Sequence, residues 1–291
     1  GGIPAEDTGV WLAGKVGAET IGDMRAMDAQ DITNSSSKAG YFPFGTIDGH
    51  ILKRQLVEVF DRGEQAKVPI LAGFNSGEIR SLRFLLPPKP NNMEEYEAAI
   101  RTGYGELADL FLRLYPSDNI TESMLAATRD AIYGWTAERL ALKQSQQGLP
   151  AYFYLWDHGY PEASKWNLHA FHASEIPYIF GTAKRTPPLW PKVPKHTSEI
   201  KLAKAMLSYW ASFARTGIPS AEGSSPWPRY AEGRAYMYIA DKPYAAHNLL
   251  PGMYELHETV VCRRRAVGTI AWNWNVGVIA PPLPETKADC L

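Results

Sequence analysis

Short apolar runs and longer helical patterns alternate along the chain. Residues 67–74, KVPILAGF, form an apolar run introduced by Pro69 and ended by glycine, and residues 151–158, AYFYLWDH, form a second run between GLP and GYP. Runs of this length between turn residues predict buried strands. The segment AYMYIA, residues 235–240, predicts a third short strand.

Helical spacing covers most of the remaining chain. Residues 5–18 predict a helix, and the polar, serine-rich segment at residues 31–40 predicts a loop after it. Residues 93–145 predict two helices that are separated at YPSDN, where Asn119 and Glu122 form a capping pair for the second helix.

The strongest helical pattern follows the proline-rich segment RTPPLWPKVPKH. Thr197 is expected to cap this helix, and Gly217 is expected just past its end. The tail predicts a further helix over residues 255–272. Strands that alternate with long helical segments predict an α/β domain. The residues expected on one face of the helix that Thr197 begins are Ile200, Ala203, Leu207, Trp210 and Ala214.

Composition excludes several classes of function. The 291 residues include 30 basic and 31 acidic side chains, interspersed, so the chain has no basic surface for nucleic acid or for anionic lipid. No apolar run is long enough to span a membrane. Cys262 and Cys290 are too few for a metal or redox motif, and the sequence leaves open whether they pair.

Candidate chemistry lies after the first two predicted strands. The segment GFNSGEI does not have the GxSxG spacing of a nucleophile elbow, so Ser76 is interpreted as a turn residue. Glu78 follows the carboxyl end of the first strand, which is where open α/β sheets place catalytic groups.

The segment LHAFHASEIPYIFG follows the second strand in the same way. If it were helical, His169, His172 and Glu175 would share one helix face. A metal site is a weak alternative, because neither HExxH nor HxxEH is present. An acid after one strand and a histidine after the next follow the order serine, acid, histidine of α/β-hydrolases. A dinucleotide site at GYGELA is excluded, because that segment lies inside a helical pattern.

Four segments in this order resemble the C-terminal half of type-B carboxylesterases, the group of cholinesterases and para-nitrobenzyl esterases. They are FPFGTIDGHIL, GEQAKVPILAGFNSGE, HAFHASEIPYIFG and SYWASFARTGIPS with SSPWPRY. The resemblance implies an α/β-hydrolase fold, Glu78 as the triad acid, His172 as the triad histidine, hydrolysis of a small-molecule ester through an acyl-serine, and no cofactor or metal. His169 and Glu175 are then expected to be supporting or structural residues.

The sequence departs from the family in two places. The family has Asp-Glu-Gly at the acid, whereas here Gly77 precedes Glu78 and Ile79 follows it. No GxSxG occurs in the 291 residues. We therefore expect residues 1–291 to be the C-terminal portion of one α/β-hydrolase domain, with a partner that carries the serine and the oxyanion hole and covers an exposed sheet edge.

Three further expectations concern function and location. Arg80 and Arg83 follow the acid and can bind carboxylate groups on an ester, although solvated surface arginines are the commoner case. Export to the periplasm or outside the cell is implied only by the resemblance. The rival interpretation is a cholinesterase-like adhesion protein that has lost its chemistry, against which Glu78 and His172 argue.

Overall fold

The computed structural model describes residues 4–268 and 276–285. Contacts within the chain divide it into two compact units, Gly1–Arg62 and Gly63–Leu291. Each unit is described separately below.

The first unit is helical. Its helices are α1 (Ala5–Val16), α2 (Ile21–Ala26), α3 (Ala29–Lys38) and α4 (Leu56–Asp61). Helix α3 contradicts the predicted loop over residues 31–40. The Asp28 carboxylate caps α3 by accepting hydrogen bonds from the backbone N–H groups of Gln30 and Asp31 at 2.8 and 3.3 Å. A good cap and tertiary packing against α1 therefore outweigh the weak helix propensity of the serines.

The second unit contains a four-stranded sheet in the order β1-β2-β3-β4. Its strands are β1 (Ile70–Asn75), β2 (Ala151–Trp156), β3 (Ala235–Ile239) and β4 (Pro243–His247). The first three strands are parallel, and β4 runs antiparallel to β3. The three predicted strands and the α/β class are confirmed, whereas β4 was not predicted because its side chains are mostly exposed.

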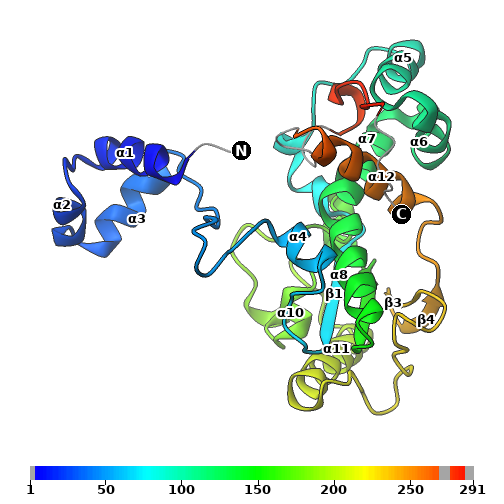
Figure 1. The fold of residues 1–291 in the computed structure, drawn as a ribbon. Helices are drawn as coiled ribbons and strands as arrows, with labels where there is room; N and C mark the ends of the chain where they lie inside the picture. The colour runs from blue at the N-terminus through cyan, green and yellow to red at the C-terminus, as the bar shows by residue number, and fades with distance from the viewer. Residues whose placement is uncertain (1–3, 269–275, 286–291) are drawn as a thin grey trace. The chain divides into compact units, whose positions relative to one another are not determined.

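Strand β2 is buried on both faces. Its alternating residues Tyr152, Tyr154 and Trp156 join a core with α10 (Ile176–Ile179) and α11 (Thr197–Thr216). Ala151, Phe153 and Leu155 point the other way, into a core with helix α8. Figure 1 shows α8 lying along β1. Helices on both faces explain why β2 has a continuous apolar sequence instead of an alternating one.

The insertion between β1 and β2 has more helices than predicted. They are α5 (Met93–Tyr104), α6 (Ala108–Leu114), α7 (Ile120–Arg129) and α8 (Trp135–Gln146). The break at YPSDN and the Asn119 cap are confirmed. Gly105 ends α5 with φ +53°, and a π-helical turn at Asp130–Gly134 separates α7 from α8. The prediction of two helices missed these two breaks.

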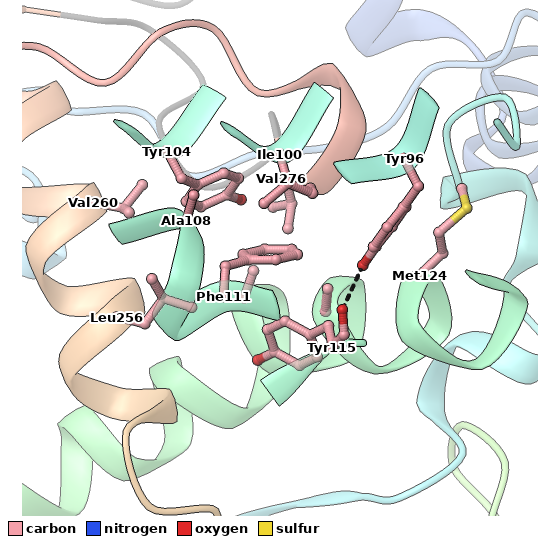
Figure 2. Close-up of a cluster of buried hydrophobic side chains, with 12 residues drawn as sticks. Tyr96, Ile100, Tyr104, Ala108, Phe111, Tyr115, Met124, Leu256, Val260 and Val276 are labelled. Carbon is pink, nitrogen blue, oxygen red and sulfur yellow. Dashed lines mark hydrogen bonds between the residues drawn. The ribbon is translucent and has the colours of Figure 1, made fainter. Parts of the chain in front are cut away.

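The insertion has its own aromatic core, drawn in Figure 2, which it shares with helix α12 (Met253–Ala266). Tyr104, Phe111 and Tyr115 pack ring against ring, with centroids 4.4 and 4.8 Å apart. The buried Tyr96 hydroxyl donates to the backbone carbonyl of Tyr115 at 2.9 Å. This core holds the insertion against the C-terminal helix.

Helix α11 begins and packs differently from the prediction. Its cap position is His196, so Thr197 is already the first helical residue; Gly217 ends the helix in a left-handed conformation, as predicted. The buried side chains are Glu199, Leu202, Met206 and Tyr209. Of the predicted face, Ala203 and Trp210 pack partly buried against the same core, whereas Ile200 and Leu207 are exposed. Two neighbouring apolar stripes run along this helix, and spacing alone does not select the one that packs.

The remaining elements are short. Helix α9 covers Pro161–Lys165, and 3-10 turns lie at Glu78–Arg80, Arg83–Leu85, Gly105–Leu107, Ser117–Asn119, Ala183–Arg185 and Gly277–Ile279. None of the helices in the described part of the chain has the length and apolar character that a membrane crossing requires. Cys262 lies on α12, which ends at Ala266 and so is shorter than the helix predicted over residues 255–272; Cys290 lies outside the described residues.

Candidate active site

The predicted acid follows the first strand directly. Strand β1 ends at Asn75, and a 3-10 turn begins at Glu78, whose side chain is buried. The backbone N–H of Asn75 donates to Glu78 Oε1 at 2.9 Å. The end of the strand therefore holds Oε1 of Glu78 and leaves Oε2 for another partner.

The segment with the predicted histidine is an irregular loop, not a helix. His169 and Ala173 have φ values of +50° and +66°, which no α-helix contains. The segment is not helical, so the condition under which His169, His172 and Glu175 would share a helix face is not met. His169 is exposed, and its ring bonds to the Asn167 side chain at 3.2 Å.

Two loops meet here: the acid loop, which follows β1 and carries Glu78, and the histidine loop, which lies between α9 and α10 and carries His172. They touch through their backbones. The N–H of Gly77 donates to the carbonyl of Ala170 at 2.9 Å, and Gly77 forms an isolated parallel bridge with Phe171. A Cβ atom at Gly77 would lie 2.7 Å from the carbonyl oxygen of Leu168 and 2.8 Å from that of Ala170. The departure from the family's Asp at this position therefore has a steric reason, because only glycine lets the two loops approach so closely.

The two loops bring Glu78 and His172 into direct contact. His172 Nδ1 lies 2.5 Å from Glu78 Oε2. The acid is buried, with 6% of its side chain exposed, whereas 44% of the histidine side chain is exposed. The hydrogen bond that His172 donates to Glu78 raises the pKa of His172, against the opposing effect of partial desolvation.

This geometry fixes the chemistry available to the imidazole. A carboxylate only accepts hydrogen bonds, so Nδ1 carries the proton and Nε2 carries the lone pair. The buried Glu78 stabilises the imidazolium that forms when Nε2 takes a proton. A partly exposed, correctly oriented imidazole of this kind can act as a general base and then as a general acid.

A second carboxylate, Glu175, lies beside the same histidine. Asn75 Nδ2 donates to Glu175 Oε2 at 2.5 Å and to the carbonyl of Phe171 at 2.9 Å. Burial raises the pKa of Glu175, and the charge of Glu175 contributes to the raised pKa of His172. Glu175 was expected to support the site, and it bonds to a residue beside the acid; Asn75 was not predicted from the sequence.

The sequence also did not indicate Tyr133. Its ring centroid lies 5.6 Å from that of His172, and burial, with the charge of Glu78, raises its pKa. Tyr133 belongs to the π-helical turn between α7 and α8. Such turns often occur at functional sites, but the helical pattern in the sequence carries no signal for them.

Ser76 has the structural role that its position predicted. Its hydroxyl donates to the Asp157 carboxylate at the end of β2, and Tyr238 donates to the other oxygen of that carboxylate. Arg129 Nη1 donates to the backbone carbonyl of Ser76 at 3.0 Å. Asp157, just after β2, and Arg129 of α7 thus hold the acid loop at Ser76. The Ser76 hydroxyl bonds to Asp157 and not to His172.

The two arginines after the acid differ in their surroundings. Arg80 pairs with Glu122 at 2.5 Å and bonds to Asn167 at 3.2 Å, with only 14% of its side chain exposed. These contacts occupy its guanidinium. Arg83 is exposed on the next 3-10 turn, so it keeps the predicted possibility of contacting a carboxylate.

No group of three His, Cys, Asp or Glu side chains within residues 4–268 and 276–285 has the arrangement of a metal site. His169, one of the three residues of the metal alternative, bonds to Asn167.

Comparisons with known proteins agree with these features. A model of the carboxylesterase family matches residues 10–256. The "Fumonisin B1 esterase" of Sphingopyxis macrogoltabida is 31% identical over 195 residues, which cover 65% of this chain and 35% of that protein. The "Pyrethroid hydrolase Ces2e" of Rattus norvegicus is 26% identical over 223 residues, which cover 70% of this chain and 38% of that protein.

Solved structures show the same fold. A structure of PNB esterase superimposes with a TM-score of 0.66 and 22% identity, over 86% of this chain and 53% of that chain. A Geobacillus stearothermophilus carboxylesterase superimposes with a TM-score of 0.57 and 20% identity, over 84% and 52%. The chain thus spans about a third to a half of the length of these relatives. The partial α/β-hydrolase fold and the resemblance to type-B carboxylesterases are confirmed, and the chain belongs to the carboxylesterase family.

Proposed function

We propose that this chain supplies the acid and the histidine of a serine-type carboxylic ester hydrolase. The observation that carries the proposal is the 2.5 Å contact between Glu78 Oε2 and His172 Nδ1. The acid is buried and the base is partly exposed, which is the arrangement a catalytic dyad requires. Membership of the carboxylesterase family supports ester hydrolysis as the reaction.

In this proposal His172 acts twice. Nε2 first removes the proton of a serine hydroxyl as the serine oxygen attacks the ester carbonyl carbon, and the imidazolium then protonates the departing alcohol. Water attacks the resulting acyl-serine with the same base, which releases the carboxylic acid and restores the serine. Glu78 holds the imidazole tautomer and stabilises its positive charge throughout.

The serine and the oxyanion hole lie, in this proposal, on polypeptide outside these 291 residues. Two observations support it: the chain has no GxSxG, and it spans only about a third to a half of its relatives. In the described part of the sheet, β1 pairs on one side only, with β2. A parallel strand with an open edge is a natural docking site for a further strand, because parallel sheets are normally covered and extended on both sides.

We further propose that both units of the chain belong to one α/β-hydrolase domain that the partner completes. Exposed apolar side chains in the first unit favour this view, since monomeric proteins rarely leave many large apolar groups in water. They include Val10, Ile21, Phe42, Phe44, Ile51 and Leu56.

An ester that carries carboxylate groups is the substrate class we propose. Arg83 is the candidate contact, because it is exposed close to Glu78 in the chain, while Arg80 is occupied by Glu122. Replacing Arg83 by Ala should raise KM for a carboxylate-bearing ester and leave KM for a neutral short-chain ester unchanged.

A fluorophosphonate probe tests the main proposal, because it labels only an activated serine. The complete native protein should hydrolyse a nitrophenyl ester, and the probe should label one serine, within a GxSxG, on polypeptide outside this chain. Labelling of a serine within the 291 residues would contradict the divided site. Absence of both hydrolysis and labelling would favour the non-catalytic adhesion protein.

A further inference from the structure

We propose that Asn75 is a positioning residue that holds Glu78 and His172 in register with each other. This inference rests on the proposed function. Asn75 is the last residue of β1, and only 1% of it is exposed. Its position before the acid loop lets it contact both the acid and the loop that carries the histidine.

Asn75 donates to both carboxylates that raise the pKa of His172. Its backbone N–H bonds to Glu78 Oε1 at 2.9 Å, and its side-chain Nδ2 bonds to Glu175 Oε2 at 2.5 Å. Hydrogen bonds to ionised acceptors are about twice as strong as those between neutral groups. A single rigid strand residue thus fixes one oxygen of each carboxylate.

The same amide nitrogen also holds the backbone next to the base. Asn75 Nδ2 donates to the carbonyl of Phe171, the residue immediately before His172, at 2.9 Å. An amide offers two N–H groups on one atom, so it can serve the Phe171 carbonyl and the Glu175 carboxylate at once. A hydroxyl offers only one, and an aliphatic side chain of similar size offers none.

The histidine loop depends on such bonds because its own backbone is unusual. Ala173 has φ +66°, a conformation that costs energy for a residue with a side chain. The loop is held from β1 by Asn75 and Gly77 and from β2 by Trp156, whose Nε1 donates to Ser174 at 2.9 Å. Of these three, Asn75 is the one that also bonds the acid, through its backbone N–H.

Removing the Asn75 side chain keeps the backbone bond to Glu78 and removes the bonds to the Phe171 carbonyl and to Glu175, so the histidine loop should shift against Glu78 and loosen the contact between Glu78 and His172. The pKa of His172 would then fall toward its ordinary value, because the hydrogen bond to Glu78 is the main cause of its elevation. The base must be neutral to act, so the acid limb of the rate profile should move to lower pH.

The experiment uses the complete enzyme, this chain with the polypeptide that supplies the serine, and measures kcat and KM for a nitrophenyl ester from pH 5 to 9. In Asn75→Ala we expect kcat to fall about 100-fold with KM little changed, as for a small misplacement of catalytic groups. The midpoint of the acid limb should move to lower pH. A purely structural role would lower the active fraction and leave this midpoint unchanged.

Two further variants keep the test decisive if Asn75→Ala folds poorly. Asn75→Ser keeps one donor and should give a smaller change in the same direction. Asn92→Ala is the matched control. The Asn92 side chain caps α5 by accepting from the Glu95 backbone N–H at 2.8 Å, so this variant loses an asparagine hydrogen bond that involves neither Glu78 nor the histidine loop. It should leave kcat and the midpoint unchanged.

His172→Ala, measured in parallel, separates the two proposals. If His172→Ala is inactive while Asn75→Ala or Asn75→Ser keeps the wild-type kcat and midpoint, the role of Asn75 is overturned and the proposed function stands. If His172→Ala keeps full activity, both proposals fail.

Discussion

Two histidines of this chain, His172 and His257, show how environment decides what an imidazole does. His172 lies in a loop after a strand, is partly exposed and contacts a buried carboxylate, so its pKa is raised. His257 lies on α12 with its ring buried, and desolvation, helped by the charge of Arg264, lowers its pKa to about 4. The first is suited to carrying a proton, and the second stays neutral.

The partners of the buried histidine fit a structural role. The Tyr115 hydroxyl donates to Asp130 Oδ2 at 3.0 Å and lies 3.0 Å from His257 Nε2. Because that hydroxyl has a single proton, Nε2 of His257 must be the donor to the Tyr115 oxygen. This network joins α12 to the insertion and has no exposed acceptor for a substrate proton.

Exchange of the two histidines for residues that cannot titrate should have opposite consequences. His172→Ala should lower kcat/KM for a nitrophenyl ester by about 10⁴-fold or more, because base and acid are both lost, with little change in melting temperature. His257→Gln should lower the melting temperature and leave kcat per folded molecule close to wild type. Activity loss in His257→Gln alone would reverse the assignment.

The pH dependence of the free energy of unfolding should also distinguish His172 from His257. The unfolded chain protonates His257 near its ordinary pKa of about 6.5, whereas the folded protein does so only near 4. The contribution of His257 to the free energy of unfolding is therefore unchanged above pH 6.5. It falls by about 3 kcal/mol as the pH drops from 6.5 to 4. His172 acts with the opposite sign, because its raised pKa makes protonation favour the folded state.

Chemical denaturation of the complete protein at pH 7 and at pH 4.5 measures this effect. The difference in unfolding free energy between the two pH values should be smaller in His257→Gln than in wild type. An equal difference in both proteins would show that His257 is not the group responsible.

A smaller effect is expected where the acid and histidine loops touch. In Gly77→Ala the new methyl group would meet two backbone carbonyls at 2.7 and 2.8 Å, which cannot move as a side-chain end can. We expect a loss of about 1–3 kcal/mol in stability, together with reduced kcat. Gly14→Ala on α1 is the control, because nothing lies within 4 Å of the added atom there; it should be neutral or stabilising.

The sequence predicts three of the four strands, because each is an apolar run between turn residues, and it misses β4, whose side chains are mostly exposed. The ends of β1 and β2 indicated the segments that hold Glu78 and His172, and the resemblance to type-B carboxylesterases selected these two residues. The sequence does not indicate a role for Asn75, because a polar residue at the end of a strand is most simply explained as the start of a turn. Its burial follows only when the loop after β2 folds over it.

The wrong predictions have a common physical cause. Helix α3 forms in a polar, serine-rich segment because Asp28 caps it and α1 packs on it, and α11 buries the stripe of Leu202 because the sheet lies on that side. The π-helical turn that directs Tyr133 at His172 depends on packing with β1. Tertiary contacts decide these features, and local pattern does not encode them.

The pH dependence of kcat/KM in wild type and Glu78→Gln tests the central claim most directly, because it measures the coupling between acid and base. We predict that the wild-type rate rises with pH through a midpoint above 6.5, since the base acts when neutral and Glu78 raises its pKa. Glu78→Gln should lower the rate by about 10³- to 10⁴-fold and move the midpoint to lower pH. A wild-type midpoint at or below 6.5, or an unchanged rate and midpoint in Glu78→Gln, would contradict the account.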